Sequence, residues 1–446
     1  MITGASTSVG NSWRHFCNPI RNAAGTPAPF RVPPGRPPCV PARDVHATQH
    51  TRRMSIPHGG GAVLTKAITA LLLLASSCVD GRAAASANQN TYFPGPGDEW
   101  QHRSPAEVGM RTGMLDSAIA YANRHETALS RDAGTWLRDR FAGQPHQDIV
   151  GPTKPRGGVN GMVVRHGYIV AEWGETERVD MTFSVTKSYL STVAGLALDR
   201  GRVPGLDERV AASVSDGTFD SPHNSTITWR HLLQQTSEWE GTLWGKPDLA
   251  DRRRGVDRTL QTPGTFWEYN DVRVNLLAYA LLHAWRRPLP AILRENIMEP
   301  IGASATWQWH GYETSWTTVD GAKVQSVSGG GHWGGGMWTS TRDHARFGLL
   351  FLRRGRWNDR QIISQQWVSE ATTPVAIQPN YGFMWWLNTD QAQFPSAPEQ
   401  SFFALGAGST NVIWIDPVHD LVVVTRWIDG AEHVNEFMRL VLEAVQ

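Results

Sequence analysis

Cysteine is confined to the start of this 446-residue chain, where it occurs at Cys17, Cys39 and Cys78. The remainder therefore has no disulfide, no thiol nucleophile and no cysteine-ligated metal. A surplus of charge is lacking as well, since the net charge is +1 and the isoelectric point is about 7.9. Such a balance gives no electrostatic argument for an acidic partner, and we expect no binding to nucleic acid.

Several well-known catalytic motifs are also missing. The sequence has no G-x-S-x-G elbow, no H-E-x-x-H pair and no P-loop lysine. Its histidines do not show the spacing of zinc ligands. We therefore expect neither a cofactor nor a metal ion.

The first ninety residues do not have the pattern of a folded domain. Residues 1–53 are rich in Pro, Gly, Arg and Ser, which predicts disorder or upstream sequence wrongly joined to the protein. In residues 54–87, Lys66 precedes the short apolar run from Ala67 to Ala75, and small residues follow. This layout predicts a secretory signal peptide, too short to span a bilayer as a mature helix, with a packed core helix as the alternative.

The end of this leader can be read in two ways. Ala-Ser-Ser-Cys at residues 75–78 is an imperfect lipobox that would place a lipid anchor on Cys78. The small residues at 83–87 would suit ordinary cleavage instead. Either reading predicts an exported protein, periplasmic or secreted, and the first would make it a lipoprotein.

From residue 98 onward the pattern is that of a globular body. Residues 106–126 have the apolar spacing of a helix, and two β-rich runs at 161–165 and 168–173 flank a tight hairpin. Helices and loops fill residues 202–320, and strand patterns return from residue 327. This order predicts an α/β (α+β) domain over 98–446, built from both ends of the chain around a mostly helical insertion.

One short segment raises a chemical question. Residues 182–201 read TFSVTKSYLSTVAGLALDRG, with Ser184 and Lys187 at the head of a predicted helix that is apolar on nearly every side. Residues three apart share a helix face, so Lys187 should reach Ser184. A desolvated lysine has a lowered pKa and can accept the serine proton. S-x-x-K arises easily by chance, so this pair alone is a weak signal.

Three later segments strengthen it through a resemblance. FSVTKSYLSTVAGLALDRG resembles the first motif of the serine β-lactamase and penicillin-binding-protein superfamily, in the branch of class C β-lactamases, family VIII esterases and 6-aminohexanoate-dimer hydrolases. PGTFWEYNDVRV places Tyr269 at the tyrosine of the family's Y-x-N, with Asp271 in the place of Asn. Residues 329–352 and 401–427 are similar to its Gly-rich segment and its last strand pair. The resemblance implies an antiparallel sheet flanked by helices, the β-lactamase/transpeptidase-like fold.

The resemblance also implies roles. Ser184 would be the nucleophile that forms an acyl-enzyme, and Lys187 and Tyr269 would share the base and acid roles, with Tyr269 as a phenolate between cations or as a proton relay. Asp271 would hold Lys187 protonated or pair with Arg273. The family's oxyanion hole uses the N–H of the nucleophile and one from the last strand pair.

In that strand pair K-T-G is absent, and Leu405 begins the sequence Leu-Gly-Ala-Gly instead. The second oxyanion donor should then lie between Gly406 and Ser409, in a stretch that includes Ala407 and Gly408. The missing lysine makes a penicillin-type carboxylate a poor fit and favours an ester or an amide.

These features leave three hypotheses. The first is an exported serine hydrolase acting on a small molecule or short peptide. The others are a D,D-peptidase or β-lactamase, and a non-catalytic sensor or binding protein. Among the tryptophans, Trp239, Trp244 and Trp267 either line the cleft or pack in the core, and His332 within GGGHWGGG is unusually placed for a core histidine.

Overall fold

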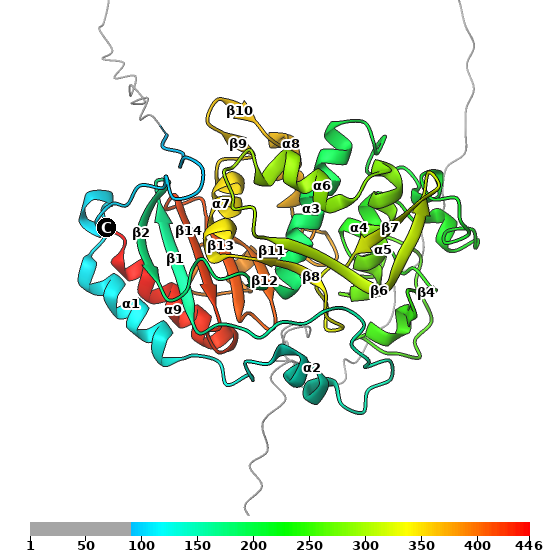
Figure 1. Cartoon of the computed structure of the whole chain (residues 1–446), viewed down its shortest axis with the longest axis horizontal. Coiled ribbons are helices and arrows are strands. Elements are labelled where there is room, and N and C mark those ends of the chain that lie inside the picture. The colour runs from blue at the N-terminus through cyan, green and yellow to red at the C-terminus, as the bar shows by residue number, and fades with distance from the viewer. Residues whose placement is uncertain (1–90) are drawn as a thin grey trace, which may run out of the picture. The chain divides into compact units, whose positions relative to one another are not determined.

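The structure is a computed structural model that describes residues 91–446 (Figure 1). The predicted disordered segment, the predicted signal peptide and Cys78 lie outside these residues. Within residues 91–446, no helix is both long enough and apolar enough to cross a membrane.

The main sheet has six antiparallel strands in the order β11-β12-β13-β14-β1-β2. The strands are β1 (Asn160–Arg165), β2 (Tyr168–Trp173), β11 (Trp386–Leu387), β12 (Phe402–Gly406), β13 (Asn411–Asp416) and β14 (Leu421–Arg426). β1 and β2 form the hairpin expected from the sequence, and β1 pairs directly with β14. The antiparallel sheet built from both ends of the chain is thus confirmed.

Alternating side chains of this sheet belong to two separate cores, as the period of two in a strand requires. One face packs against α1 (Thr112–Arg124) and α9 (Gly430–Ala444), and the other packs against α7 (Thr341–Leu352), as Figure 1 shows. On β1, for example, Val163 belongs to the first core, while Met162 and Val164 belong to the second. Helices therefore cover both faces of the sheet.

A second group of elements lies beyond one end of the main sheet (Figure 1). Its four-stranded sheet has the order β3-β8-β6-β7. These strands are β3 (Asp180–Met181), β6 (Gln308–Val319), β7 (Ala322–Val327) and β8 (Gly336–Thr339). The helices are α2 (Ala133–Phe141), α3 (Thr186–Asp199), α4 (Trp229–Leu233), α5 (Asp271–Trp285), α6 (Leu289–Leu293) and α8 (Gln365–Ala371). Two further two-stranded ribbons are β4 (Thr242–Leu243) with β5 (Lys246–Pro247), and β9 (Arg356–Trp357) with β10 (Arg360–Gln361).

Helix α3 lies at the centre of the molecule and is buried from Thr186 to Ala197. Its packing is close, since a Cβ at Gly195 would overlap the indole of Trp367. This burial agrees with the apolar character of the helix on all sides. It also means that Lys187, in the first turn, has almost no access to water.

One boundary expected from the sequence is wrong. Strands return at Gln308 with β6 rather than at residue 327, so the end of the predicted helical insertion is a long strand. Strand β6 is hard to recognise in the sequence because its burial pattern is irregular. Its pairing with β7 shifts register between Gly311 and Trp316. Such a bulge breaks the simple alternation by which a strand is recognised in a sequence.

Candidate active site

Ser184 lies in a tight 3₁₀ turn, Phe183–Val185, between β3 and α3. Phe183 has a left-handed φ of 50°, which is uncommon for a bulky residue, and its ring packs against Trp136 and Trp427 at centroid distances of 5.3 and 6.3 Å. The Thr186 hydroxyl also donates to the Phe183 carbonyl at 2.6 Å. The turn is therefore held firmly, and it leaves Ser184 half-buried, next to fully buried neighbours.

Lys187 contacts the candidate nucleophile directly. Its Nζ lies 2.7 Å from Ser184 Oγ, 2.8 Å from Asp271 Oδ1 and 3.3 Å from the Gly329 carbonyl oxygen. Only 1% of the residue is exposed. Burial lowers the pKa of Lys187, and the neighbouring Asp271 carboxylate opposes this without cancelling it. The neutral form of Lys187 is therefore populated at a lower pH here than it would be at a protein surface.

Tyr269 and Asp271 reach the same place from the start of α5. Asn270 caps this helix by accepting hydrogen bonds from the N–H groups of its first turn, so the residues on either side of it are fixed. Two cations lie near the Tyr269 ring, with Lys187 Nζ at 5.0 Å and the Arg253 guanidinium at 4.9 Å from its centroid. The sequence predicts either Lys187 or Arg273 as the partner of Asp271. In the structure Asp271 contacts Lys187.

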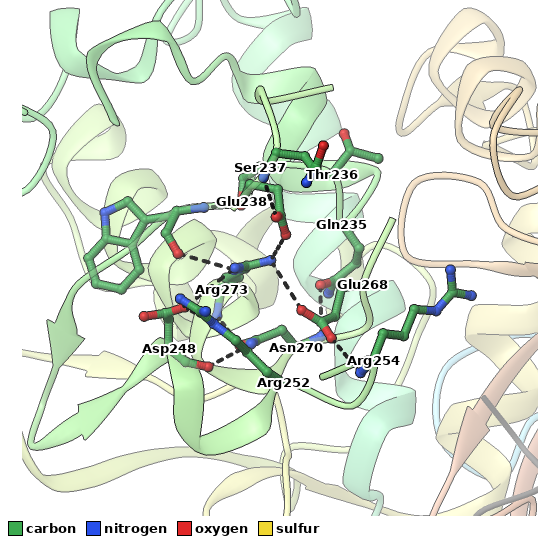
Figure 2. Close-up of polar contacts among 12 residues, drawn as sticks. Gln235, Thr236, Ser237, Glu238, Asp248, Arg252, Arg254, Glu268, Asn270 and Arg273 are labelled. Atoms are coloured by element: carbon green, nitrogen blue, oxygen red, sulfur yellow. Dashed lines mark hydrogen bonds and ion pairs between the residues drawn. The ribbon is translucent and has the colours of Figure 1, made fainter. Parts of the chain in front are cut away.

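The other candidate partner, Arg273, belongs to a buried ion-pair network beside this loop (Figure 2). Its guanidinium donates to Glu238 at 2.6 Å and lies 3.7 Å from Glu268, and all three side chains are at most 1% exposed. Glu268 immediately precedes Tyr269, and the Gln235 side chain accepts from the N–H of Asn270 at 3.1 Å. The network therefore anchors the loop that carries Tyr269.

The predicted oxyanion segment also lies against the nucleophile. A Cβ built on Gly406, at the end of β12, would stand 3.3 Å from the Ser184 nitrogen and would clash with the Thr182 carbonyl oxygen. The next three residues, Ala407, Gly408 and Ser409, have φ values of 48°, 67° and 68°. Glycine at 406 thus permits a close approach of two backbones, which is what an oxyanion site next to the Ser184 N–H requires.

The three tryptophans have different surroundings. Trp239 is 3% exposed and donates to the Thr218 carbonyl, so it is a core residue. Trp267, also 3% exposed, packs edge-on against Tyr381 and near Tyr269. Trp244 is half-buried and touches Tyr279 and Tyr312, with no contact to Ser184 among those found in the described residues.

Comparison with known proteins identifies the family of this chain. The family model for β-lactamase matches residues 144–426, which is more than half of the chain. The chain belongs to the β-lactamase family. The resemblance noted in the sequence is therefore confirmed, and family membership makes the protein a hydrolase of the β-lactamase-related superfamily.

Three similar proteins have low sequence identity to this chain. An uncharacterized protein of Alkalihalophilus pseudofirmus is 25% identical over 272 residues, which cover 54% of this chain and 71% of the relative. A candidate β-lactamase from Bacteroides dorei has 16% identity and a TM-score of 0.51, covering 75% of this chain and 99% of its own. A β-lactamase from Mycobacterium bovis has 21% identity and a TM-score of 0.46, covering 69% and 97%. The Bacteroides structure supports the shared fold.

Compared with the family's Y-x-N motif, this β-lactamase family member has additional charges behind Lys187. The Asp251 carboxylate accepts from the N–H of Asp271 at 2.6 Å and pairs with Arg253 at 2.9 Å, while His332 Nδ1 lies 3.3 Å from Asp271 Oδ2. Ligand atoms of Asp251, Asp271 and His332 lie within 4.8 Å of one another. Since Lys187 and Arg253 already neutralise both carboxylates, we interpret the group as an internal ion-pair cluster rather than a cation site.

The pKa values of the two aspartates in this cluster shift in opposite directions. Burial raises the pKa of Asp271, but the charge of Lys187 and the contact with His332 outweigh burial and hold it well below the usual range. Burial also raises the pKa of Asp251, and here the nearby Asp271 carboxylate adds to the rise. Sequence reasoning did not predict Asp251 or Arg253, because their only signal was the run DRRRG, which reads as an ordinary charged loop.

Proposed function

We propose that this protein is a serine hydrolase that cleaves an ester or amide of a small molecule through an acyl-enzyme on Ser184. The observation that carries the proposal is the 2.7 Å contact between Lys187 Nζ and Ser184 Oγ. Lys187 is buried while Ser184 remains half-buried, so a substrate can approach the hydroxyl but water scarcely solvates the base. This is the arrangement that an activated serine needs.

In the proposed reaction, Ser184 Oγ attacks the substrate carbonyl carbon as its proton moves to Lys187 Nζ. The N–H of Ser184 and one from the segment after Gly406 stabilise the oxyanion of the tetrahedral intermediate. Lys187 and Tyr269 then return the proton to the leaving alcohol or amine as its bond to the carbonyl breaks. Water then attacks the acyl carbon and gives a proton to the same groups. They return this proton to Ser184 Oγ as the acyl–oxygen bond breaks and the acid leaves.

The charges around the site favour a neutral substrate over a penicillin-type anion. The segment Leu405–Gly406–Ala407–Gly408 supplies no lysine. The nearby cation Arg253 is already paired with Asp251 and Asp271. A substrate carboxylate would therefore find no lysine in this segment, and the charge of Arg253 is already shared with two carboxylates of the protein.

Export belongs to the same proposal. It rests on the signal-peptide pattern of residues 54–87, which would direct the enzyme to the periplasm or the medium, with lipidation at Cys78 as the anchored form. Mass determination of the mature protein from cells would find an N-terminus at a lipid-bearing Cys78 or near residue 87. A mature protein that retains residues 54–87 would contradict export.

Active-site labelling tests the chemistry. A fluorophosphonate probe should label the intact protein at one site, and Ser184→Ala should abolish that label. A fluorescent penicillin should label weakly or not at all if esters and amides are preferred. Strong penicillin labelling would instead support the peptidase or β-lactamase hypothesis. Absence of label from both probes on folded protein would leave only the binding-protein hypothesis.

A further inference from the structure

Asp271 creates a difficulty for a lysine base. A carboxylate 2.8 Å from Lys187 Nζ favours the ammonium form, in which the lysine cannot accept the Ser184 proton. The family's usual asparagine at this position would not have that effect. If Lys187 simply lost its proton to water, the buried Asp271 carboxylate would lose its closest cation, which is costly in a site of low dielectric.

His332 lies where it can remove this cost. Its Nδ1 is 3.3 Å from Asp271 Oδ2, on the opposite oxygen from the one that Lys187 contacts. The imidazole is held in place by stacking on Phe141 and by a tilted contact with Trp333, with ring centroids 4.3 and 4.1 Å away. Since 12% of its side chain is exposed, His332 can exchange protons with solvent while Lys187 cannot.

We propose that His332 holds the proton that Lys187 must give up, so that Asp271 always faces one cation. This inference rests on the proposed function of Ser184. In one arrangement the ammonium of Lys187 and a neutral imidazole flank the Asp271 carboxylate. In the other, a neutral amine and an imidazolium flank it. One N–H bond at Nζ breaks and one at the ring forms, and neither the proton count nor the net charge changes.

The surrounding charges are compatible with this exchange. The charged groups found around His332 in the described structure are Asp271 on α5, Asp251 and, across the Trp333 ring, Lys246. Arg253 pairs with both aspartates and remains in place in either arrangement. His332 acts through Asp271 and Lys187, so it is a positioning residue rather than a catalytic one.

The test is the pH dependence of kcat/KM for hydrolysis of p-nitrophenyl acetate, after subtraction of the Ser184→Ala background. In the native protein, sharing of the proton gives activity that is nearly independent of pH around neutrality. In His332→Gln, activity at pH 7 should fall by roughly 100-fold, the order of effect that general acid–base groups have on rate. As the pH is raised, kcat/KM of His332→Gln should increase tenfold per pH unit until Lys187 is fully deprotonated.

Two comparisons separate this role from a merely structural one. His310 is also half-buried, packs against Trp338 and contacts Gln308, and none of its side-chain contacts in the described residues involves Ser184, Lys187 or Asp271, so His310→Gln should match the native profile. In an Asp271→Asn background the carboxylate that contacts both Lys187 and His332 is gone, so adding His332→Gln should change kcat/KM less than twofold. His332→Asn provides a smaller replacement with the same expectation as His332→Gln.

A His332→Gln profile that parallels the native one would overturn the inference, as would an equal loss in the Asp271→Asn background. Failure of the proposed function itself has a different signature, since the fluorophosphonate would then not label Ser184 in the native protein. If Ser184 is labelled and turns over substrate but His332 has no influence on the pH profile, only the role of His332 is wrong.

Discussion

Replacing Glu238 by glutamine should destabilise the protein in a way that depends on pH. Glu238 is fully buried between two arginines, with Arg258 donating at 2.5 and 2.7 Å and Arg273 at 2.6 Å. The N–H of Gln261 donates to the same carboxylate at 2.9 Å. Glutamine has nearly the same shape, so Glu238→Gln removes the charge while leaving the packing almost unchanged.

The magnitude follows from the ionisation of this carboxyl. Burial raises the pKa of Glu238, but the hydrogen bonds and charges of Arg258 and Arg273, with the Gln261 N–H, outweigh burial and bring it from 4.5 to about 2. A folded-state pKa below the unfolded one stabilises the protein above pH 4.5 and is lost as pH falls toward 2. The ionised Glu238 carboxylate thus contributes about 3 kcal/mol to the free energy of unfolding at pH 7 and roughly 1.5 kcal/mol at pH 3. Glu238→Gln should remove this contribution.

Urea unfolding followed by tryptophan fluorescence at pH 7 and pH 3 measures this difference. Glu240, two residues along and exposed, offers a matched control, and Glu240→Gln should change the free energy of unfolding by less than about 0.5 kcal/mol. Equal stabilities of the two variants at pH 7 would refute the reasoning. So would a loss in Glu238→Gln that is as large at pH 3 as at pH 7.

Two substitutions test the machinery around Ser184. Lys187→Arg should reduce p-nitrophenyl acetate turnover to the Ser184→Ala level, because arginine stays protonated, and retained activity would exclude Lys187 as the base. Gly406→Ala should lower kcat/KM by about 100-fold, the loss that follows removal of an oxyanion donor, because the new Cβ clashes with the Thr182 carbonyl oxygen. Gly113→Ala in α1 has open space around its Cβ and should leave turnover unchanged, whereas equal activity of both glycine variants would argue against an oxyanion site at Gly406.

How much the sequence could predict depended on how local each feature is. The contact between Lys187 and Ser184 follows from a spacing of three residues in one helical segment, and the β1–β2 hairpin follows from two short runs around a turn. Both were placed from the sequence alone. The approach of Gly406 to Ser184 was located only to within a few residues, through the resemblance to the family.

Features that depend on long-range packing could not be predicted from the sequence. Asp251 and His332 come from two loops and meet Asp271 only because the 3₁₀ turn before residue 252 and the Gly-rich segment fold against the start of α5. No periodicity links such residues. The early start of β6 was missed for the opposite reason, since a local bulge hid a regular element.

The sheet that joins the two ends of the chain has a consequence for the timing of folding. Ser184 and Gly406 come from distant segments, and β12 reaches the 3₁₀ turn as part of a sheet in which β14 pairs with β1. During synthesis the ribosome releases residues 160–200 long before residues 402–426. Until β14 has paired with β1, the nascent chain has Ser184 and Lys187 but no oxyanion site. The pairing of β14 with β1 joins residues far apart in the sequence, and such long-range contacts form slowly. A chain that ends before β12 would therefore be inert, and any reactivity of Ser184 would report completion of the main sheet.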